Sequence, residues 1–388
     1  MLHVLTLSTL FPNAAQPVLG VFVERQTLGL AALPGVEVRV VAPIGLPPAP
    51  LHLHPHYRSR AALPLVEHRK GLLIHRPRYR VLPRVGEAGT ARSMARALLP
   101  LLRDIRGRFP FDVIDAEFFW PDGPAAMLLS RALGVPFSIK ARGADIQYWG
   151  GRPRIGPQLL EASRAAGGLL SVSAALRRSM IGLGMPGERI AVHYTGVDLD
   201  RFVPVDRAAA KARLGVSGPL LVTAGALIAR KNQWLTLAAL ERLPEATLLA
   251  IGDGPDRSEL ERIARATGVA SRVRFLGSRP HAELPALLGA ADVMILPSLS
   301  EGLANVWVES LACGTPIVIS DVGGARELVT SHAAGRITDF GAGQIADAVR
   351  AILADPPAPA AARSAAESFT WERNARQLRD HLERVTRT

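Results

Sequence analysis

Cysteine is almost absent from this chain of 388 residues. The single residue, Cys313, excludes an internal disulfide and any metal site built from several cysteines. Aromatic residues make up only 5%, and no stretch interleaves basic and aromatic residues, so no nucleic-acid partner is expected. Apolar runs stay short of the roughly 18 residues that a membrane-spanning helix requires. The opening MLHVLTLSTLFP lacks a basic leader and predicts a strand, not a signal peptide. These absences predict a cytoplasmic protein that is at most peripheral to a membrane.

Acidic residues are also in the minority, 34 against 46 Lys and Arg, and the imbalance lies mainly in the first half. Residues 1–200 hold 24 basic and 14 acidic residues, whereas residues 201–388 hold 22 and 20. One stretch holds nine arginines against only two acidic residues, Glu87 and Asp104; the arginines are Arg76, Arg78, Arg80, Arg84, Arg92, Arg96, Arg103, Arg106 and Arg108. Such a stretch suits nucleic acid, an anionic membrane surface or an acidic acceptor, and a generally arginine-rich composition would explain it equally well. Its segment 90–109 has the pattern of a basic amphipathic helix, which packs against a sheet more often than it lies on a membrane.

What the chain does contain is a regular alternation of strand-like apolar runs and helix-like amphipathic segments in both halves. Residues 1–41, for example, follow the order strand, long loop, helix, strand. With 48% apolar residues, the chain can bury two ordinary cores. The pattern predicts an α/β protein with two doubly wound domains facing across a cleft.

Two glutamates eight residues apart, Glu301 and Glu309, stand in the stretch PSLSEGLANVWVESLACGTPIV (297–318). The apolar run before them predicts a buried strand, and NVWVESLA predicts a helix capped by Asn305. Ligands of parallel sheets bind at such strand-to-helix turns, where free N–H groups attract anions. The N–H groups expected to be free follow Gly302 and belong to Leu303, Ala304 and Asn305. Two carboxylates beside an anion are useful if they hold hydroxyl groups of the same ligand, as in a nucleotide-sugar. The alternative is that both glutamates are solvated surface residues.

As a whole, EGLANVWVESLACGTPIVISDVGGARELV resembles the E-x7-E signature of the retaining glycosyltransferases of family 4, which have the GT-B fold. The resemblance implies transfer of a sugar from a nucleotide-sugar donor to a glycan or lipid-linked acceptor, without a metal or other cofactor. It implies an N-terminal acceptor-binding Rossmann-like domain at 1–198 and a C-terminal nucleotide-sugar-binding domain at 206–370. A last helix (371–388) would pack back on the first domain. TGVDLDRF is similar to the family's interdomain segment, with Thr195 where asparagine is usual.

The C-terminal half carries the donor residues that the resemblance implies. Glu309 would hold the ribose and Glu301 the sugar hydroxyls near the anomeric carbon, while Arg230 and Lys231 would neutralise the diphosphate. An exposed pair at a helix start is the alternative for the two cations. Besides the catalytic Glu301, Arg230 and Lys231, the donor-side set comprises Gly225, Gly252, Arg279, Gly302, Leu303, Ala304, Asn305 and Glu309. The glycines form only part of a dinucleotide fingerprint, so they do not favour NAD.

The N-terminal half departs from the family's usual pattern. Gly20 ends the long loop after the first strand, where the resemblance implies proximity to the donor phosphates; a plain turn is the alternative. Four polar residues follow two later strands and form the expected acceptor side: Glu117 and Asp122, then Arg142 and Asp145. No histidine stands where the family usually has one. The acceptor hydroxyl would then lose its proton to the leaving phosphate, with Asp122 as the catalytic carboxylate that orients it. Capping of the following helix is the alternative for Asp122.

Two other functions stay open. A nucleotide-sugar-binding protein without transferase activity would keep the donor residues, and the missing histidine is compatible with it. A nucleic-acid-binding protein is indicated only by the high pI. A metal site is also conceivable at His52, His54 and His56, but no carboxylate accompanies them and the surrounding prolines favour a loop, so we expect neither metal nor cofactor. The nucleotide, sugar, acceptor, general base and oligomeric state are not determined by these patterns.

Overall fold

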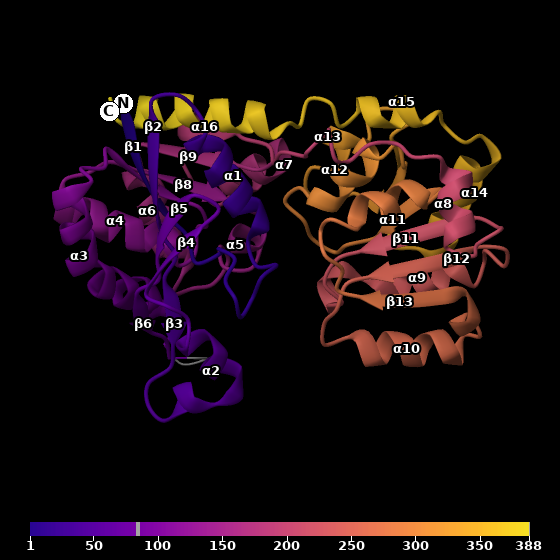
Figure 1. Ribbon diagram of the computed structural model, residues 1–388, viewed down its shortest axis with the longest axis horizontal. Helices are drawn as coiled ribbons and strands as arrows, with labels where there is room; N and C mark the ends of the chain where they lie inside the picture. The colour runs from indigo at the N-terminus through magenta and orange to yellow at the C-terminus, as the bar shows by residue number, and fades with distance from the viewer. Residues whose placement is uncertain (83–85, 388) are drawn as a thin grey trace. The chain divides into compact units, whose positions relative to one another are not determined.

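The computed structural model describes residues 1–82 and 86–387, so Arg84 of the arginine stretch lies outside the described residues. The chain divides into two compact units (Figure 1). Unit 1 comprises residues 1–196 together with 371–388, and unit 2 comprises residues 197–370. The acceptor and donor functions expected for the two domains stay predictions.

Unit 1 is built on a sheet of eight strands in the order β10-β9-β8-β7-β1-β2-β5-β4. Neighbouring strands are parallel except β4 and β5, which form an antiparallel edge. The strands are β1 (Leu2–Leu7), β2 (Val36–Val41), β4 (Val66–Arg69), β5 (Leu72–His75), β7 (Val113–Ala116), β8 (Phe137–Ala141), β9 (Gly168–Ser171) and β10 (Ile190–Val192). A separate parallel pair, β3 (Ile44–Leu46) and β6 (Arg78–Arg80), lies beside it. Every residue of the central strands β7, β8 and β9 is buried because both faces of the sheet are covered.

Helices cover both faces of this sheet. They are α1 (Val21–Ala31), α2 (Pro55–Ala61), α3 (Thr90–Arg108), α4 (Asp122–Leu133), α5 (Ala144–Gln147), α6 (Gly156–Ala165), α7 (Ala174–Gly182) and α16 (Trp371–Val385). On one face, Leu30 of α1 and Leu378 of α16 join Val4 and Val113 in an apolar cluster. On the other face α4 packs against β7 and β8 and is itself covered by α3. The apolar side of α3 is therefore buried inside unit 1.

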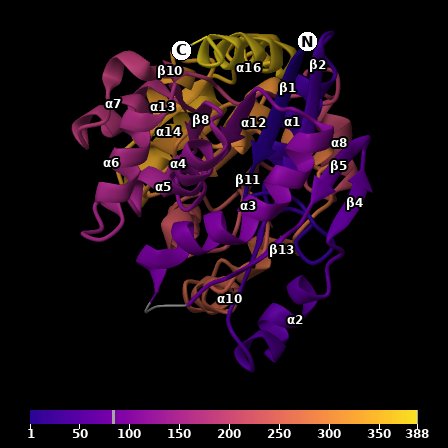
Figure 2. The ribbon, with the colours of Figure 1, turned by 90° about the vertical axis from the view of Figure 1, so that its left-hand side faces the viewer.

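The last helix, α16, lies along unit 1 because one stripe of its surface is apolar. Its buried residues Ala375, Leu378, Leu382 and Val385 recur every three or four positions, as an amphipathic helix requires. On the same side, Nε2 of His381 lies 2.7 Å from Oγ of Ser138 on β8. Figure 2, which looks onto unit 1, shows α16 running past β1 and β8, with the N- and C-termini at the same end of the unit.

The Pro- and His-rich stretch is not simply a loop. It contains β3, a one-turn helix η1 (Leu51–Leu53) and α2. The side chain of His56 lies outside what the structure describes, and among the described side chains no group of three or more His, Cys, Asp or Glu suited to a metal ion occurs. Within residues 1–82 and 86–387, no helix is long and apolar enough to cross a membrane.

Unit 2 repeats the α/β plan with a sheet of six parallel strands in the order β13-β12-β11-β14-β15-β16. The strands are β11 (Leu220–Ala224), β12 (Thr247–Ile251), β13 (Val273–Gly277), β14 (Val293–Leu296), β15 (Ile317–Ser320) and β16 (Gly335–Thr338). The helices are α8 (Arg207–Arg213), α9 (Gln233–Leu240), α10 (Arg257–Ala266), α11 (Leu284–Ala290), α12 (Asn305–Ala312), α13 (Ala325–Leu328), α14 (Ala342–Ala354) and α15 (Pro359–Ser364). The sheet order reverses between β11 and β14, which is where parallel sheets bind ligands.

Candidate functional site

Three charged side chains meet at the carboxyl end of the unit 2 sheet, beside the switch between β11 and β14. Lys231 Nζ donates to Oε1 of Glu301 over 2.5 Å, and Arg230 Nη1 lies 3.3 Å from Oε2. The same Arg230 nitrogen donates to the carbonyl oxygen of Ser300 over 2.6 Å. Lys231 and Glu301 are largely buried, while Arg230 is 38% exposed. The structure therefore brings together the three residues that the sequence singled out as catalytic on the donor side.

Glycines allow the neighbouring loops to approach this cluster. Gly225 follows β11 with φ +148°, and Gly252 follows β12 with φ +131°. A Cβ atom on Gly252 would lie 1.9 Å from the carbonyl oxygen of Gly225, so only glycine fits there. Gly225 itself lies beside the aliphatic part of the Lys231 side chain. The two glycines thus leave backbone, not side chains, facing the space next to the lysine.

The loop that carries Glu301 rests on a second glycine turn. The N–H group of Gly324 donates to the carbonyl oxygen of Gly302 over 2.8 Å. Gly323 has φ +53°, and a Cβ atom there would lie 2.4 Å from the carbonyl oxygen of Glu301. The sequence predicted only a tight turn at these glycines. Their support of the Glu301 loop was missed, because a pair of glycines does not show what it packs against.

The start of α12 differs from the expectation in one detail. The helix begins at Asn305, and Ala304 occupies the capping position without a side-chain hydrogen bond, so Asn305 is not the cap. Within the part of the chain that the structure describes, the N–H groups of Leu303, Ala304 and Asn305 have no hydrogen-bond partner. The first N–H groups of a helix have no partner inside it, and they attract anions. Free donors thus follow directly after Glu301.

Glu309 has a partner that the sequence did not indicate. His281 Nε2 lies 2.7 Å from Oε1 of Glu309, and the His281 ring packs edge-on against Phe202 at 5.1 Å between centroids. Glu309 is 7% exposed, so it is not the solvated helix residue of the alternative interpretation. No local sequence pattern indicates a contact between a histidine before α11 and a glutamate in α12, because the two residues come together only when the chain folds. Arg279 lies near them in the chain but pairs with Glu283, 3.7 Å away, and both are substantially exposed.

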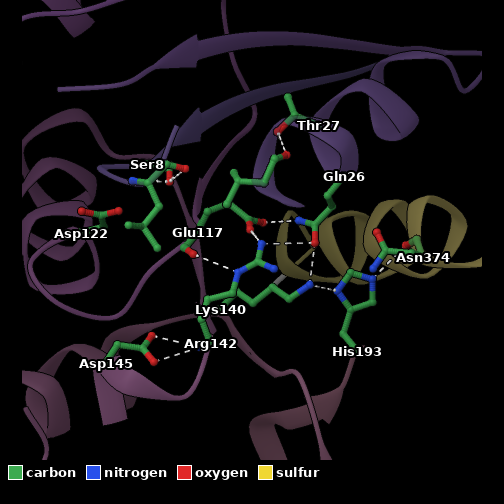
Figure 3. Close-up of polar contacts among 12 residues, drawn as sticks. Ser8, Gln26, Thr27, Glu117, Asp122, Lys140, Arg142, Asp145, His193 and Asn374 are labelled. Atoms are coloured by element: carbon green, nitrogen blue, oxygen red, sulfur yellow. Dashed lines mark hydrogen bonds and ion pairs between the residues drawn. The ribbon is translucent and has the colours of Figure 1, made fainter. Parts of the chain in front are cut away.

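In unit 1, the residues expected on the acceptor side belong to a buried polar network (Figure 3). Arg142 Nη2 forms an ion pair with Oε2 of Glu117, and Gln26 of α1 donates to the other carboxylate oxygen. Lys140 Nζ lies 2.5 Å from Oε1 of Gln26 and 2.8 Å from Nδ1 of His193. His193 Nε2 lies 2.8 Å from the carbonyl oxygen of Asn374 in α16. The network joins α1, β8 and α16 with the segments that follow β7 and β10, and the sequence indicated only Glu117 and Arg142 of its members.

Burial controls the protonation of this network. It lowers the pKa of Lys140 well below its usual range, and Arg142 adds to that effect. Burial and then Lys140 likewise lower the pKa of His193, so this imidazole is neutral, with its proton on Nε2 facing the Asn374 carbonyl. Burial opposes the charge of Glu117, but Arg142 and Lys140 outweigh it and leave the pKa below its usual value. Glu117 and Arg142 therefore carry opposite charges inside the unit.

Asp145 and Asp122 are engaged by backbone groups. The Asp145 carboxylate accepts N–H bonds from Phe119, Arg142 and Gly143 at 2.8–3.1 Å, and is fully buried. It holds the loops after β7 and β8 together. Asp122 Oδ2 accepts the N–H of Thr9 over 2.9 Å. Asp122 starts α4 but makes no capping bond, so the capping interpretation is wrong. Their roles toward an acceptor stay predictions.

The other Asp122 oxygen, Oδ1, has no hydrogen-bond partner among the described residues. Burial raises the pKa of Asp122 to about 7, although the Thr9 hydrogen bond opposes the shift. A raised pKa means that the protonated carboxyl stabilises the fold, and that this contribution is lost as the pH rises through about 7. An Asp122→Asn variant should therefore be more stable than the wild type at about pH 8, with a smaller difference at about pH 5. Thermal unfolding at both pH values measures this. The exposed Asp347→Asn serves as control, and an equal offset at both pH values for Asp122→Asn would contradict the expectation.

Gly20 stands at the start of α1 with φ +67°. A Cβ atom there would lie 2.2 Å from the carbonyl oxygen of Leu10, so the loop after β1 closes tightly on this glycine. The tight turn alone is enough to explain why this position is a glycine. Its proximity to donor phosphates stays a prediction.

Each of the two units matches a family of known proteins. Residues 206–369 match the family described as Glycosyl transferases group 1, and residues 19–201 match Glycosyltransferase Family 4. The putative teichuronic acid biosynthesis glycosyltransferase TuaC of Bacillus subtilis is 28% identical over the whole of both chains. The D-inositol 3-phosphate glycosyltransferase of Mycobacterium tuberculosis is 38% identical over 212 residues, which is 50% of this chain and 44% of that one.

Solved structures share the fold. Sucrose-phosphate synthase from Thermosynechococcus elongatus superposes with a TM-score of 0.80 at 21% identity, covering 99% of both chains. Anabaena HepE, solved in complex with UDP and glucose, gives 0.75 at 19% identity, covering 99% of this chain and all of that one. The expected GT-B class of α/β fold is thereby confirmed. The two family matches together span most of the chain, and the protein belongs to the glycosyltransferases of group 1 and family 4.

Proposed function

We propose that this protein is a retaining glycosyltransferase that moves a sugar from a nucleotide-sugar donor to a hydroxyl group of a glycan or lipid-linked acceptor. The observation that carries the proposal is the convergence of Glu301, Lys231 and Arg230 at the switch point of the unit 2 sheet. A nucleotide-sugar donor has two polar parts to be bound, the diphosphate and the sugar hydroxyls, and this cluster offers groups for both. The cations and N–H groups suit the diphosphate, and the carboxylate suits sugar hydroxyls.

Each donor residue has a task in this proposal. Lys231 and Arg230 stabilise the charge that develops on the departing diphosphate, so no metal ion is needed for that purpose. Glu301 holds hydroxyls of the transferred sugar, and Glu309 accepts hydrogen bonds from the ribose. Because His281 already contacts one oxygen of Glu309, it orients that carboxylate for the ribose. The glycine backbones at 225 and 252 lie against the nucleotide.

The names of the similar proteins guide the choice of donor. HepE has been solved with UDP-glucose, and TuaC is named for teichuronic acid biosynthesis. UDP-sugars are therefore the first donors to test, and a surface polysaccharide the first acceptor. The carboxylates of Glu117 and Asp145 are buried and engaged by partners within unit 1, which supports proton transfer from the acceptor hydroxyl to the leaving phosphate over a base at either of them.

The decisive experiment screens UDP-, GDP- and ADP-sugars for stabilisation of the protein against heat, followed by transfer assays with the donor that binds. A ligand at 100 times its dissociation constant adds about 2.7 kcal/mol of stability. Stabilisation by one donor class and turnover with retained anomeric configuration would support the proposal. Stabilisation without turnover of any acceptor would favour a nucleotide-sugar-binding protein instead, and inversion would remove the retaining mechanism.

We further propose a peripheral contact with an anionic membrane, on the cytoplasmic side, made by exposed arginines of α3. Because the apolar side of α3 is buried against α4, the contact would be electrostatic, without insertion of the helix. Co-sedimentation with vesicles should then rise with their content of anionic lipid and fall as salt is added. Binding that ignores both would contradict the electrostatic contact. Neutral vesicles are the control.

A further inference from the structure

Unit 1 contains a cavity that none of the candidate site residues lines. Its volume is about 1070 Å³, and its walls come from β3, β6, the start of α3 and the segment between β3 and η1. The upper size of ordinary small-molecule pockets is roughly 1,000 Å³, so the cavity has room for a ligand larger than a single sugar. Three of the residues that line it, Arg80, Arg92 and Arg96, are exposed to solvent.

The lining of this cavity is strongly basic. Arg78, Arg80, Arg92 and Arg96 contribute to it together with His52, and no described lining residue is Asp or Glu. Burial lowers the pKa of Arg78, and the charge of Arg76 adds to the effect. Positive charge is thus accumulated here without a carboxylate in the lining to balance it.

The arginines of this region fall into two groups. Several have partners within unit 1 that explain them structurally. Arg76 is buried against Glu67 at 2.5 Å, Arg106 donates to the Leu133 carbonyl, and Arg108 pairs with Asp104 at 2.7 Å. Arg78 lines the cavity, yet it also donates to three backbone carbonyl groups. Basic residues of this group need no ligand.

Arg80, Arg92 and Arg96 form the second group. Their side chains are exposed and make no ion pair or hydrogen bond with any residue in the described ranges. They come from two elements, β6 and α3, and all three line the same cavity. Free guanidinium groups scattered over a surface need no explanation, but three that line one hollow make it complementary to a multivalent anion.

The walls that carry these arginines are fixed in place. Ser93 Oγ donates to the carbonyl oxygen of Arg80 over 2.7 Å and so ties α3 to β6. The turn before α3 is held by Arg152, which pairs with Glu87 at 2.7 Å, and by Gln158, which donates to the Ala88 carbonyl over 3.0 Å. A ligand would thus meet a prearranged cavity, which lowers the entropic cost of binding.

We propose that this cavity binds the phosphate or diphosphate group of a ligand, separately from the donor diphosphate in unit 2. Guanidinium groups match phosphate oxygens in pairs, and such bonds are about twice as strong as neutral ones. The ligand is a phosphorylated acceptor or its phosphorylated carrier, either a lipid or a water-soluble molecule. This identification of the ligand rests on the proposed function; the binding of the phosphate group does not.

The test is a calorimetric titration of the full-length protein with inorganic pyrophosphate. The wild type should show two sites. A variant with Arg80→Gln, Arg92→Gln and Arg96→Gln should bind pyrophosphate at one of the two sites at least tenfold more weakly than the wild type. A variant with Arg230→Ala and Lys231→Ala should lose the other. The matched control removes the same charge from three exposed arginines outside both the cavity and α3, Arg178→Gln, Arg213→Gln and Arg265→Gln, and should retain both sites.

The outcomes separate the two proposals. Loss of the same site in the control variant, or one site that depends only on Arg230 and Lys231, overturns the cavity proposal and leaves the transferase proposal standing. A cavity site in a protein that no nucleotide-sugar stabilises overturns the transferase proposal and leaves the binding of a phosphate group in the cavity standing. Repeating the titration with phosphatidic acid vesicles identifies the source of the phosphate. If pyrophosphate and vesicles both bind, the ligand is either soluble or a lipid. Binding of pyrophosphate alone indicates a soluble ligand, and binding of vesicles alone indicates a lipid headgroup. Each conclusion requires that the cavity variant loses the binding and that the control variant retains it.

Discussion

Replacing Lys231 by alanine is expected to lower sugar transfer by about 100- to 1000-fold while the protein stays folded, the usual effect of removing one donor that stabilises developing charge. Lys231 is only 12% exposed and lies 2.5 Å from Glu301, at the point where the leaving diphosphate is expected. Its removal leaves Arg230 to balance the glutamate, so the fold should tolerate the change. Transfer rates at saturating donor, with thermal unfolding alongside, measure the two effects.

Lys211→Ala is the matched control for this substitution. Lys211 pairs with Asp292 at 2.8 Å and is similarly buried, but it lies on α8, outside the cluster. It should retain normal transfer. Glu301→Gln should behave like Lys231→Ala, because it keeps the shape of the side chain but loses the charge. Near-normal rates in either cluster variant, or equal losses in the Lys211 variant, would contradict the assignment of the donor site.

The second large effect concerns stability. Arg142→Met should destabilise unit 1 by about 3–5 kcal/mol, because it leaves the charge of Glu117 buried without its ion-pair partner. Glu117 is 0% exposed and Arg142 only 7%. The double variant Glu117→Gln, Arg142→Met should cost less than Arg142→Met alone, since it leaves no unpaired charge. Urea unfolding of the three proteins measures the difference.

An exposed ion pair provides the comparison. Arg131 and Glu161 lie 3.1 Å apart with both side chains more than half exposed, so Arg131→Met should cost less than about 1 kcal/mol. If Arg142→Met costs no more than Arg131→Met, the buried pair does not stabilise unit 1. If the double variant is as unstable as the single one, the unpaired charge is not the cause.

Much of the donor side could be predicted from the chain because its residues are close in sequence to elements with strong patterns. The strand β14 is a continuous apolar run, and Glu301 lies in the loop that follows it; Arg230 and Lys231 likewise lie in the loop that follows β11. Parallel strands present their carboxyl ends at one edge, so these residues meet whatever the details of packing. The acceptor side was harder, since Glu117 and Arg142 proved to be members of a buried network with Gln26, Lys140 and His193.

By itself, the sequence determined the alternation of elements, the α/β class, the family resemblance and the residues at the strand ends, since these depend on local patterns. Only the tertiary structure decided which side chains are partners. The contacts of His281 with Glu309, of Gly324 with Gly302 and of Lys140 with His193 join residues 22 to 53 positions apart. It also separated the arginines bound within unit 1 from Arg80, Arg92 and Arg96, which line the cavity. Composition reports the total charge, whereas the position of each charge depends on how β6 and α3 pack together.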